Sequence, residues 1–456
     1  MSDEVAGAPG VEGEGPAAPA AGPEAPSAPS AEAAAAEPQA PAAPANPPIP
    51  EAPAAPAVPV VRRQSIVTRS GACDMRVGAG ATDSLGQSLK SVVGKPRRVL
   101  LVQAADVAEG LVERVRRTLA DVGFDVRARE LPGGRASRNL ATASSLMGSL
   151  AEEGVTADDA VVVVGDADLI SLAVFVASTW CGGCVLAAVP TTLDGMVDVT
   201  VTPRMLDVGE APERLLARGN VRLAVCDPDN LTDPSAPADE GTLMGRAVMV
   251  AGGVAAGSQT FNELAVRADA LLAGDAEATV DEVLEMTKSR CRVASSSALA
   301  VRQGVTYGQD IARALGRLVD AAPSRLLGEG LRIAARLAVA HSPADEHLVD
   351  FVFVQDGLLE KLGLDEVPCD VDPEALLAAL RDVAYERANR FMPALPLDYG
   401  RVRLTSIEDE TLSEHVHAWC RARRRLKRKL ARAAERAAEG APAPQPGAEA
   451  QDDPKE

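Results

Sequence analysis

Two short apolar runs separated by a helical pattern lie near the middle of the chain. Ala160 to Val164 is a β-branched run that ends at Gly165, and Cys184 to Val189 is a second apolar run that ends at Pro190. Between them, Leu169 to Trp180 has the length and periodicity of a helix. The pattern predicts a βαβ unit, and the carboxyl ends of such strands usually border a ligand crevice.

The residues on either side of this unit alternate between strand and helix patterns. Such alternation indicates a doubly wound, mostly parallel sheet. The segments are a short strand and a polar helix within Ser65 to Val93, strands at Arg98 to Gln103, Phe124 to Arg129 and Arg222 to Cys226, and helices at Ala108 to Val122 and Asn139 to Glu153.

From Gly241 to about Leu380 nearly every segment has a helical pattern. Arg401 to Leu404 is predicted as a final strand, and Glu408 to Glu439 as a long helix. The other predicted helices are Phe261 to Leu272, Thr279 to Val293, Gly308 to Val319, Gly328 to Ala340 and Val349 to Leu362.

These patterns predict an α/β fold in which a doubly wound, Rossmann-like domain is followed by an all-helical domain. We expect a disordered Ala/Pro-rich tail over residues 1–62, a nucleotide-binding type of α/β domain over 63–238, a helical domain over 239–418, and a basic helix with a disordered acidic tail over 419–456. The crevice between two such domains is the default place for a ligand.

Composition limits the classes of function. The formal net charge of −19 argues against a protein that coats nucleic acid as a whole, and only 2% of residues are aromatic, which leaves few platforms for stacking bases. No apolar run has the roughly 18 residues of a membrane span, and the N-terminus lacks a secretion signal pattern. We therefore expect a cytoplasmic protein without a membrane span.

Cysteine and basic residues add two local features. Seven scattered cysteines suggest reduced thiols, and in Cys181-Gly-Gly-Cys184 the helix precedes the pair, so its dipole opposes the thiolate of a thioredoxin-type site. We expect neither redox chemistry nor zinc binding there. The segment from Arg421 to Arg432 is strongly basic; it is either a solvated helix or a surface that binds RNA, anionic lipid or an acidic partner.

Four motifs agree in order and spacing with one family. Residues from about Ser65 to about His417 resemble 3-dehydroquinate synthase, an enzyme of the shikimate pathway and of aromatic amino acid biosynthesis. The motifs are Leu131-Pro-Gly-Gly-Arg-Ala-Ser-Arg138 in place of a nucleotide-binding loop, Val189-Pro-Thr-Thr-Leu193 with Val197-Asp198, Gly304-Val-Thr-Tyr-Gly-Gln-Asp-Ile311, and Leu327-Gly-Glu-Gly330.

The resemblance implies a lyase that uses NAD and a divalent metal, usually zinc, held by a Glu and two His. It eliminates phosphate from a seven-carbon sugar acid phosphate and closes a ring. The family histidines fall within positions that here are Val305, Gln309 and Leu327, and the Glu lies near Gly245 or Arg246. Apolar side chains do not coordinate zinc, so we predict no metal site. His341 and His347 are an alternative, relocated metal cluster, although a solvated helix-end histidine is commoner.

The resemblance also assigns cofactor and substrate positions. Cofactor-binding residues would be Arg135, Arg138, Gly165, Thr191 and Thr192, but the NAD site is weakened because Asp166 and Asp168 replace parts of the family's glycine motif and would repel phosphate. The substrate-contacting or vestigial catalytic residues would be Asp198, Arg204 and Arg290.

Three hypotheses follow. The first is a pseudoenzyme that keeps the fold, binds a sugar phosphate or another small anionic ligand, and forms the homodimer that the resemblance implies. The second is an active sugar phosphate cyclase with a rebuilt site, in which Arg135, Arg138, Arg204, Arg290 and Arg302 clamp anions and Asp198 or Glu329 is an acid or base. The third is a non-catalytic interaction protein that acts through its tails and basic helix.

Overall fold

A computed structural model describes residues 60–95, 97–216, 218–342 and 346–438. The described residues all belong to one compact unit. The predicted tail over 1–62, apart from residues 60–62, and the acidic tail over 439–456 lie outside the described residues. The domain boundary at residues 238 and 239 stays a prediction.

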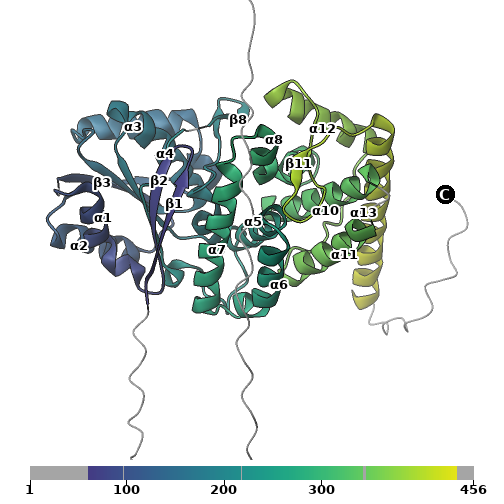
Figure 1. The fold of residues 1–456 in the computed structure, drawn as a ribbon, viewed down its shortest axis with the longest axis horizontal. Coiled ribbons are helices and arrows are strands. Elements are labelled where there is room, and N and C mark those ends of the chain that lie inside the picture. The colour runs from purple at the N-terminus through teal and green to yellow at the C-terminus, as the bar shows by residue number, and fades with distance from the viewer. Residues whose placement is uncertain (1–59, 96, 217, 343–345, 439–456) are drawn as a thin grey trace, which may run out of the picture. The chain divides into compact units, whose positions relative to one another are not determined.

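A seven-stranded sheet organises the first half of the described chain (Figure 1). Every neighbouring pair of strands is parallel except β1 and β2, which form an antiparallel hairpin. The predicted α/β fold with a mostly parallel sheet is therefore confirmed. In spatial order the strands are β1 (Arg62–Thr68), β2 (Gly71–Val77), β9 (Leu223–Cys226), β6 (Val185–Pro190), β5 (Ala160–Gly165), β3 (Arg98–Ala104) and β4 (Asp125–Leu131).

Both faces of the sheet are covered, which is why β5 is an unbroken apolar run. Successive side chains of a strand point to opposite faces. Val162 and Val164 of β5 join one buried cluster with α1 (Leu85–Val93) and α2 (Glu109–Asp121). Val161 and Val163 join the other cluster, to which α3 (Leu140–Glu152) and α4 (Ala167–Thr179) contribute.

The second half, residues 240–438, is called the helical part below. Its long helix α10 packs against α5, α9, α11 and α13. A two-stranded sheet of β10 (Ala394–Pro396) and β11 (Val402–Leu404) accompanies the helices. The helices are α5 (Glu240–Ala256), α6 (Ser258–Leu272), α7 (Ala276–Ala294), α8 (Leu299–Arg302), α9 (Gln309–Leu315), α10 (Pro323–His341), α11 (Glu346–Lys361), α12 (Pro373–Ala388) and α13 (Asp409–Ala438).

Three segments differ from the sequence-based prediction. The first strand within Ser65 to Val93 is a hairpin of two strands, because Gly71 provides the turn with a φ of 146°. The polar loop after β6 contains a π-helical turn (Gly195–Val199) and a second hairpin, β7 (Leu206–Val208) with β8 (Ala211–Leu215). The helix predicted to reach Val319 ends at Leu315.

The amino-terminal half of α13 is fixed to α10 by a buried ion pair. Glu329 is fully buried, and its carboxylate accepts hydrogen bonds from Trp419 Nε1 at 2.7 Å and from Arg423 Nη2 at 2.8 Å. Arg423 also pairs with Glu366 at 2.6 Å. Among the described residues, none of the helices is both long and apolar enough to cross a membrane.

Helices α6 and α7 share a buried carboxyl group. Glu282 has no exposed surface, accepts a hydrogen bond from Arg267 Nη1 at 3.1 Å, and leaves its Oε1 without a hydrogen-bond partner. Burial raises the pKa of Glu282 to about 7, and Arg267 offsets only part of this effect. The folded state therefore prefers the protonated carboxyl.

This raised pKa predicts how stability depends on pH. The contribution of the Glu282 carboxyl to the unfolding free energy is complete below the unfolded pKa of 4.5 and is lost as pH rises through about 7. From pH 4 to pH 8, the unfolding free energy of the wild type should therefore fall by about 3 kcal/mol more than that of the Glu282→Gln variant, which has no carboxyl group to ionise. Urea unfolding at several pH values measures this difference. The exposed Glu277→Gln control on the same helix should follow the wild type, and equal profiles for all three proteins would contradict the prediction.

Candidate functional site

The candidate site lies at the carboxyl ends of β5 and β6. Gly165 ends β5 and is paired in register with Pro190, which ends β6. The π-helical turn that follows β6 contacts α4, α5 and α7. Residues of the sheet and of the helical part therefore meet at these strand ends, where the sequence predicted a ligand crevice.

Asp166 occupies the start of α4, where helix amides favour an anion. Its Oδ1 accepts hydrogen bonds from the amides of Asp168 at 2.7 Å and Leu169 at 3.0 Å. Its Oδ2 accepts a 2.6 Å hydrogen bond from the amide of Gly134, in the predicted nucleotide-binding loop. The amides that could bind a pyrophosphate at this helix start are therefore satisfied by a carboxylate of the chain itself.

The other predicted cofactor-binding residues of the βαβ unit are held by packing and backbone contacts. A Cβ on Gly165 would lie 3.1 Å from Ala104 Cβ, and the φ of 158° is one that L side chains rarely adopt, so a substitution here would be strained. The amide of Thr191 donates a 3.0 Å hydrogen bond to the carbonyl of Gly165. Thr192 faces Gly241 at the start of α5, where a Cβ would lie 2.6 Å from Thr192 Cβ. Close backbone approach therefore joins α5 to the end of β6.

Asp168 pairs with two of the predicted anion-binding arginines. Its Oδ1 lies 3.2 Å from Arg138 Nε and 3.1 Å from Arg204 Nη1. The side chain of Arg138 is only 6% exposed. A buried guanidinium without an opposite charge is strongly unfavourable, so these arginines are stabilised by the carboxylate that the sequence predicted would repel phosphate.

Arg204 has a second buried partner. Its Nη2 forms an ion pair with Asp194, whose side chain is 5% exposed. Burial alone would lower the pKa of Arg204, but the carboxylates of Asp194, Asp168 and Asp198 outweigh it, and the pKa is raised. The guanidinium therefore remains charged.

Asp198 and Arg290 form a buried pair between the π-helical turn and α7. Arg290 Nη2 lies 2.5 Å from Asp198 Oδ1 and 2.9 Å from Thr202 Oγ1. Both residues are at most 5% exposed. Gly252 of α5 leaves space for Arg290, because a Cβ there would lie 3.2 Å from Arg290 Cγ. The two predicted substrate contacts therefore contact each other.

The β7–β8 hairpin adds carboxylates to the same arginines. Glu213 pairs with Arg138 at 3.4 Å and with Arg313 of α9. Its φ of 52° is left-handed, which is uncommon for a residue other than glycine. Asp207 accepts a 2.7 Å hydrogen bond from the amide of Glu213 and lies 3.3 Å from Arg135. The hairpin therefore holds two carboxylates beside the predicted nucleotide-binding loop.

The ion-paired arginines and carboxylates at the ends of β5 and β6 are called the crevice network below. Its members all belong to ion pairs that link the ends of β5 and β6, the hairpin, α7 and α9. Five guanidinium groups face six carboxylates, which leaves a net charge of −1. They are Arg135, Arg138, Arg204, Arg290 and Arg313 with Asp168, Asp194, Asp198, Asp207, Glu213 and Asp310.

Five members of the network were not assigned a role from the sequence: Asp194, Asp207, Glu213, Asp310 and Arg313. Two of them had a local signal, since Asp194 directly follows the Pro-Thr-Thr-Leu motif and Asp310 lies within the Gly304 to Ile311 motif. The pairing of Glu213 with Arg313, 100 positions apart, is visible only in the folded chain.

The positions that the resemblance assigned to metal ligands hold unsuitable groups. Val305 packs against the core, Leu327 is 5% exposed, and the side-chain amide of Gln309 donates to the carbonyl of Val305 at 3.2 Å. At Gly245 a Cβ would lie 2.9 Å from the amide nitrogen of Asp194, so no carboxylate fits there. Arg246 instead donates to the carbonyl of Leu362.

The remaining predicted site residues lie apart from the crevice network. Arg302 donates to the carbonyls of Ser296 and Ser297, and Glu329 is enclosed by α13, so neither is placed as an anion clamp or an acid. His341 ends α10 and His347 is exposed. Within the described ranges, no three His, Cys, Asp or Glu residues come together as a potential metal site.

The two cysteines of the Cys-Gly-Gly-Cys segment lie where α4 ends, as predicted. Cys181 is exposed in a left-handed conformation with a φ of 51°. Burial raises the pKa of the Cys184 thiol to about 11, and neighbouring Cys181 adds to the effect. A thiolate at Cys184 is therefore disfavoured near neutral pH.

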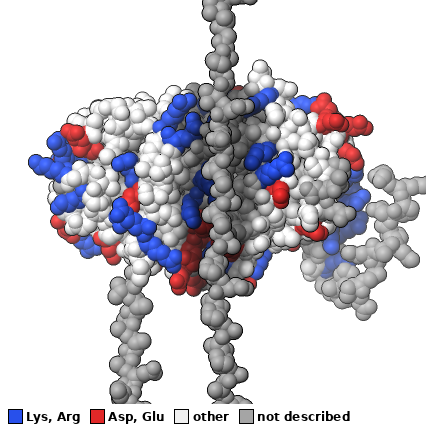
Figure 2. All heavy atoms as spheres, viewed as in Figure 1, with Lys and Arg blue, Asp and Glu red and all other residues white. Residues whose placement is uncertain are grey.

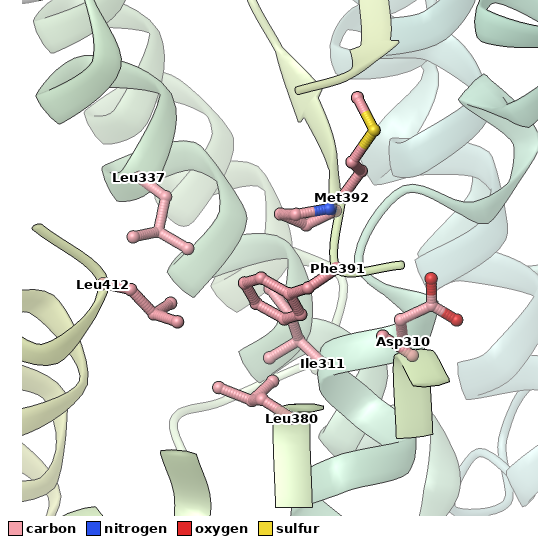
Figure 3. Close-up of a pocket in the computed structure, with 9 residues that line it drawn as sticks. Asp310, Ile311, Leu337, Leu380, Phe391, Met392 and Leu412 are labelled. Carbon is pink, nitrogen blue, oxygen red and sulfur yellow. The ribbon is translucent and has the colours of Figure 1, made fainter. Parts of the chain in front are cut away.

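A small pocket in the helical part borders the network at one residue (Figure 3). It has room for little more than one water molecule. In Figure 3 the carboxylate of Asp310 points away from the apolar side chains of Phe391 and Ile311. The pocket residues are Asp310, Ile311, Leu337, Leu380, Ala384, Phe391, Met392, Pro393 and Leu412. This apolar volume does not fit a phosphorylated ligand.

Sequence comparison finds similarity to 3-dehydroquinate synthases. Residues 128–205 match the family described as 3-dehydroquinate synthase N-terminal. The 3-dehydroquinate synthase of Symbiobacterium thermophilum is 28% identical over 335 residues, which cover 72% of this chain and 92% of that protein. The enzyme of Nocardia farcinica is 28% identical over 281 residues, covering 55% and 74%.

Solved structures share the fold at lower identity. A 2-deoxy-scyllo-inosose synthase complexed with carbaglucose-6-phosphate, NAD+ and Co2+ has a TM-score of 0.67 at 16% identity, covering 78% of this chain and all of that one. The 2-epi-5-epi-valiolone synthase of Streptomyces hygroscopicus, with NAD+ and Zn2+ bound, has a TM-score of 0.64 at 16% identity, covering 77% and 97%. These likenesses establish the Rossmann-like and helical arrangement.

The buried Asp198–Arg290 pair predicts a large effect of single substitution. Asp198→Ala leaves a buried guanidinium without its carboxylate and should cost about 3–5 kcal/mol of unfolding free energy, measured by urea denaturation. The double variant Asp198→Ala/Arg290→Met should recover much of that loss. As a control, Asp158→Ala breaks an ion pair whose side chains are 54% and 71% exposed and should cost at most about 1 kcal/mol. Similar losses for both single variants would refute the buried pair.

Proposed function

We propose that this chain, which is similar to 3-dehydroquinate synthases, is a diverged member of that family that keeps the fold without the metal-dependent reaction. The charge balance of the crevice network carries this proposal: five guanidinium groups already face six carboxylates of the chain. A phosphorylated sugar acid would bring further negative charge to a site with a net charge of −1. Electrostatic repulsion therefore opposes the binding step that any reaction requires.

The start of α4 does not fit a nicotinamide dinucleotide. A pyrophosphate bound there would need hydrogen bonds from the amides that already donate to Asp166, including that of Gly134 at 2.6 Å. It would also lie close to the carboxylate of Asp168. The 2-deoxy-scyllo-inosose synthase complex contains NAD+, whereas this helix start supports binding of NAD only if the Asp166 side chain moves away.

The donor set does not fit a catalytic zinc ion. Zinc requires imidazole, thiolate or carboxylate ligands, and the assigned positions supply a valine, a leucine, a glutamine amide and a glycine against which Asp194 packs. Without a Lewis acid there is no group at these positions to polarise a substrate hydroxyl. We therefore assign the chain a non-catalytic role, as a binding or regulatory protein built on the enzyme fold.

An active sugar phosphate cyclase with a rebuilt site is the second candidate. It is favoured by the gathering of Arg138, Arg204 and Arg290 at one end of the sheet, where a polyanionic ligand could replace their carboxylate partners. Such a ligand would stabilise the folded state. This candidate and the non-catalytic one therefore differ in a measurable response to ligand.

Metal content and catalytic turnover test the non-catalytic role directly. The purified protein should contain no stoichiometric zinc and should release no phosphate from the seven-carbon sugar acid phosphate, because the donor set lacks imidazole and carboxylate groups. Elemental analysis and a phosphate-release assay measure both quantities. The Symbiobacterium thermophilum relative, assayed in parallel with added zinc and NAD+, is the positive control. Stoichiometric zinc together with turnover would exclude the non-catalytic role.

Ligand binding at the crevice network distinguishes the two candidate functions. A ligand that binds only the folded state raises the unfolding free energy by about 2.7 kcal/mol when its concentration is about 100 times its dissociation constant. NAD+ and a sugar phosphate are tested for this effect in a thermal-shift assay. We expect no shift for the wild type, since the crevice network is complete without ligand. A clear rise in Tm that disappears in the Arg204→Met variant would favour the rebuilt cyclase instead.

A further inference from the structure

From Arg421 onward, α13 bears a stripe of arginines that is directed away from the body of the protein. Arg421, Arg425, Arg428, Arg432 and Arg436 are separated by three or four residues and are all exposed. At 100° per residue, they lie within an arc of about 80° on the helix surface. With a rise of 1.5 Å per residue the stripe extends for about 22 Å.

The opposite face of the helix is the one that packs on the protein. Its buried residues are Leu412, Val416, Trp419, Cys420 and Arg423, which are centred about 170° from the arginine stripe. Arg423 takes part in the buried pair with Glu329 and is not a member of the stripe. The docked face therefore fixes the stripe in an outward orientation.

The last turns of α13 stand clear of the protein. Every residue from Lys427 to Ala438 is exposed, and Leu430 retains 49% of its surface. In Figure 1 the yellow end of α13 continues past the neighbouring helices, and in Figure 2 blue side chains are visible beside it. A helix surrounded by solvent in this way can enter a groove, which a helix packed along its whole length cannot.

The five arginines lack a carboxylate of the described chain in direct contact. None of them forms an ion pair there, whereas neighbouring Arg424, outside the stripe, pairs with Asp370 at 2.6 Å. The only acidic residue between Arg421 and Ala438 is Glu435. The guanidinium groups of the stripe are thus available to bind phosphates, for which their planar donor geometry is well suited.

We propose that this stripe binds the phosphate backbone of double-stranded DNA without sequence specificity, the projecting helix lying in the major groove. The groove is about 12 Å wide, which accommodates a helix of about 10–12 Å diameter. Residues 421–438 contain no aromatic side chain, so neither base stacking nor aromatic insertion into a membrane is supported. The net charge of −19 opposes binding, but salt screens charges beyond about 10 Å.

The test measures salt-dependent binding of the full-length chain to a fluorescein-labelled 20-base-pair DNA duplex by anisotropy. Five phosphate contacts predict a slope of about −4.5 for log K against log salt, or about 500-fold weaker binding between 50 mM and 200 mM salt. Arg428→Ala/Arg432→Ala/Arg436→Ala should reduce the slope to about −1.8. Alanine favours helix, so this variant should keep its circular dichroism spectrum.

A variant with the same change of charge elsewhere provides the control. Arg69→Ala/Arg117→Ala/Arg129→Ala removes three exposed arginines from other elements and should retain the wild-type slope. Equal loss of binding in both triple variants, or absence of DNA binding at 50 mM salt, would overturn the proposal. Binding to phosphatidylserine vesicles or polyglutamate in preference to the duplex would overturn it as well.

Discussion

The pairing of buried arginines with carboxylates is the interaction on which the crevice depends. A guanidinium removed from water is tolerated only when an opposite charge and hydrogen bonds replace its solvation. Arg290 of α7 meets Asp198 of the π-helical turn at 2.5 Å, and Asp168 of α4 lies between Arg138 and Arg204. Because each pair joins different elements, the same contacts that neutralise the arginines also hold the sheet against the helical part.

This arrangement is the basis of the proposal that the fold is retained while the site has changed. Close backbone approach of α5 to the end of β6 requires Gly241 and Gly245, and it places packed backbone where the family resemblance expected a metal-binding carboxylate. At the start of α4, Asp166 accepts hydrogen bonds from the amides that would otherwise be free to bind a phosphate. Carboxylates and close packing thus occupy the positions to which the family resemblance assigned anionic ligands and a metal, and the proposed non-catalytic role rests on their combined effect.

The sequence predicted elements with long or fully apolar patterns better than short polar ones. The strand at Ala160–Gly165 was recognisable because both of its faces are buried, and the family motifs located Asp198, Arg204 and Arg290 at one site. The β7–β8 hairpin was missed because its strands are short and polar. The contribution of Glu213 could not be foreseen, since its partners Arg138 and Arg313 are brought together only by the folded sheet and α9.

The central claim is that carboxylates of the chain occupy the arginines and helix amides of the crevice. A crystal structure of the full-length protein grown with millimolar NAD+ and inorganic phosphate tests it most directly. The account predicts intact contacts of Asp166 with the start of α4 and of Asp168 with Arg138 and Arg204, and no density for dinucleotide between β5 and α5. Density for NAD+ with its pyrophosphate at the start of α4 and the Asp166 side chain displaced would contradict the account.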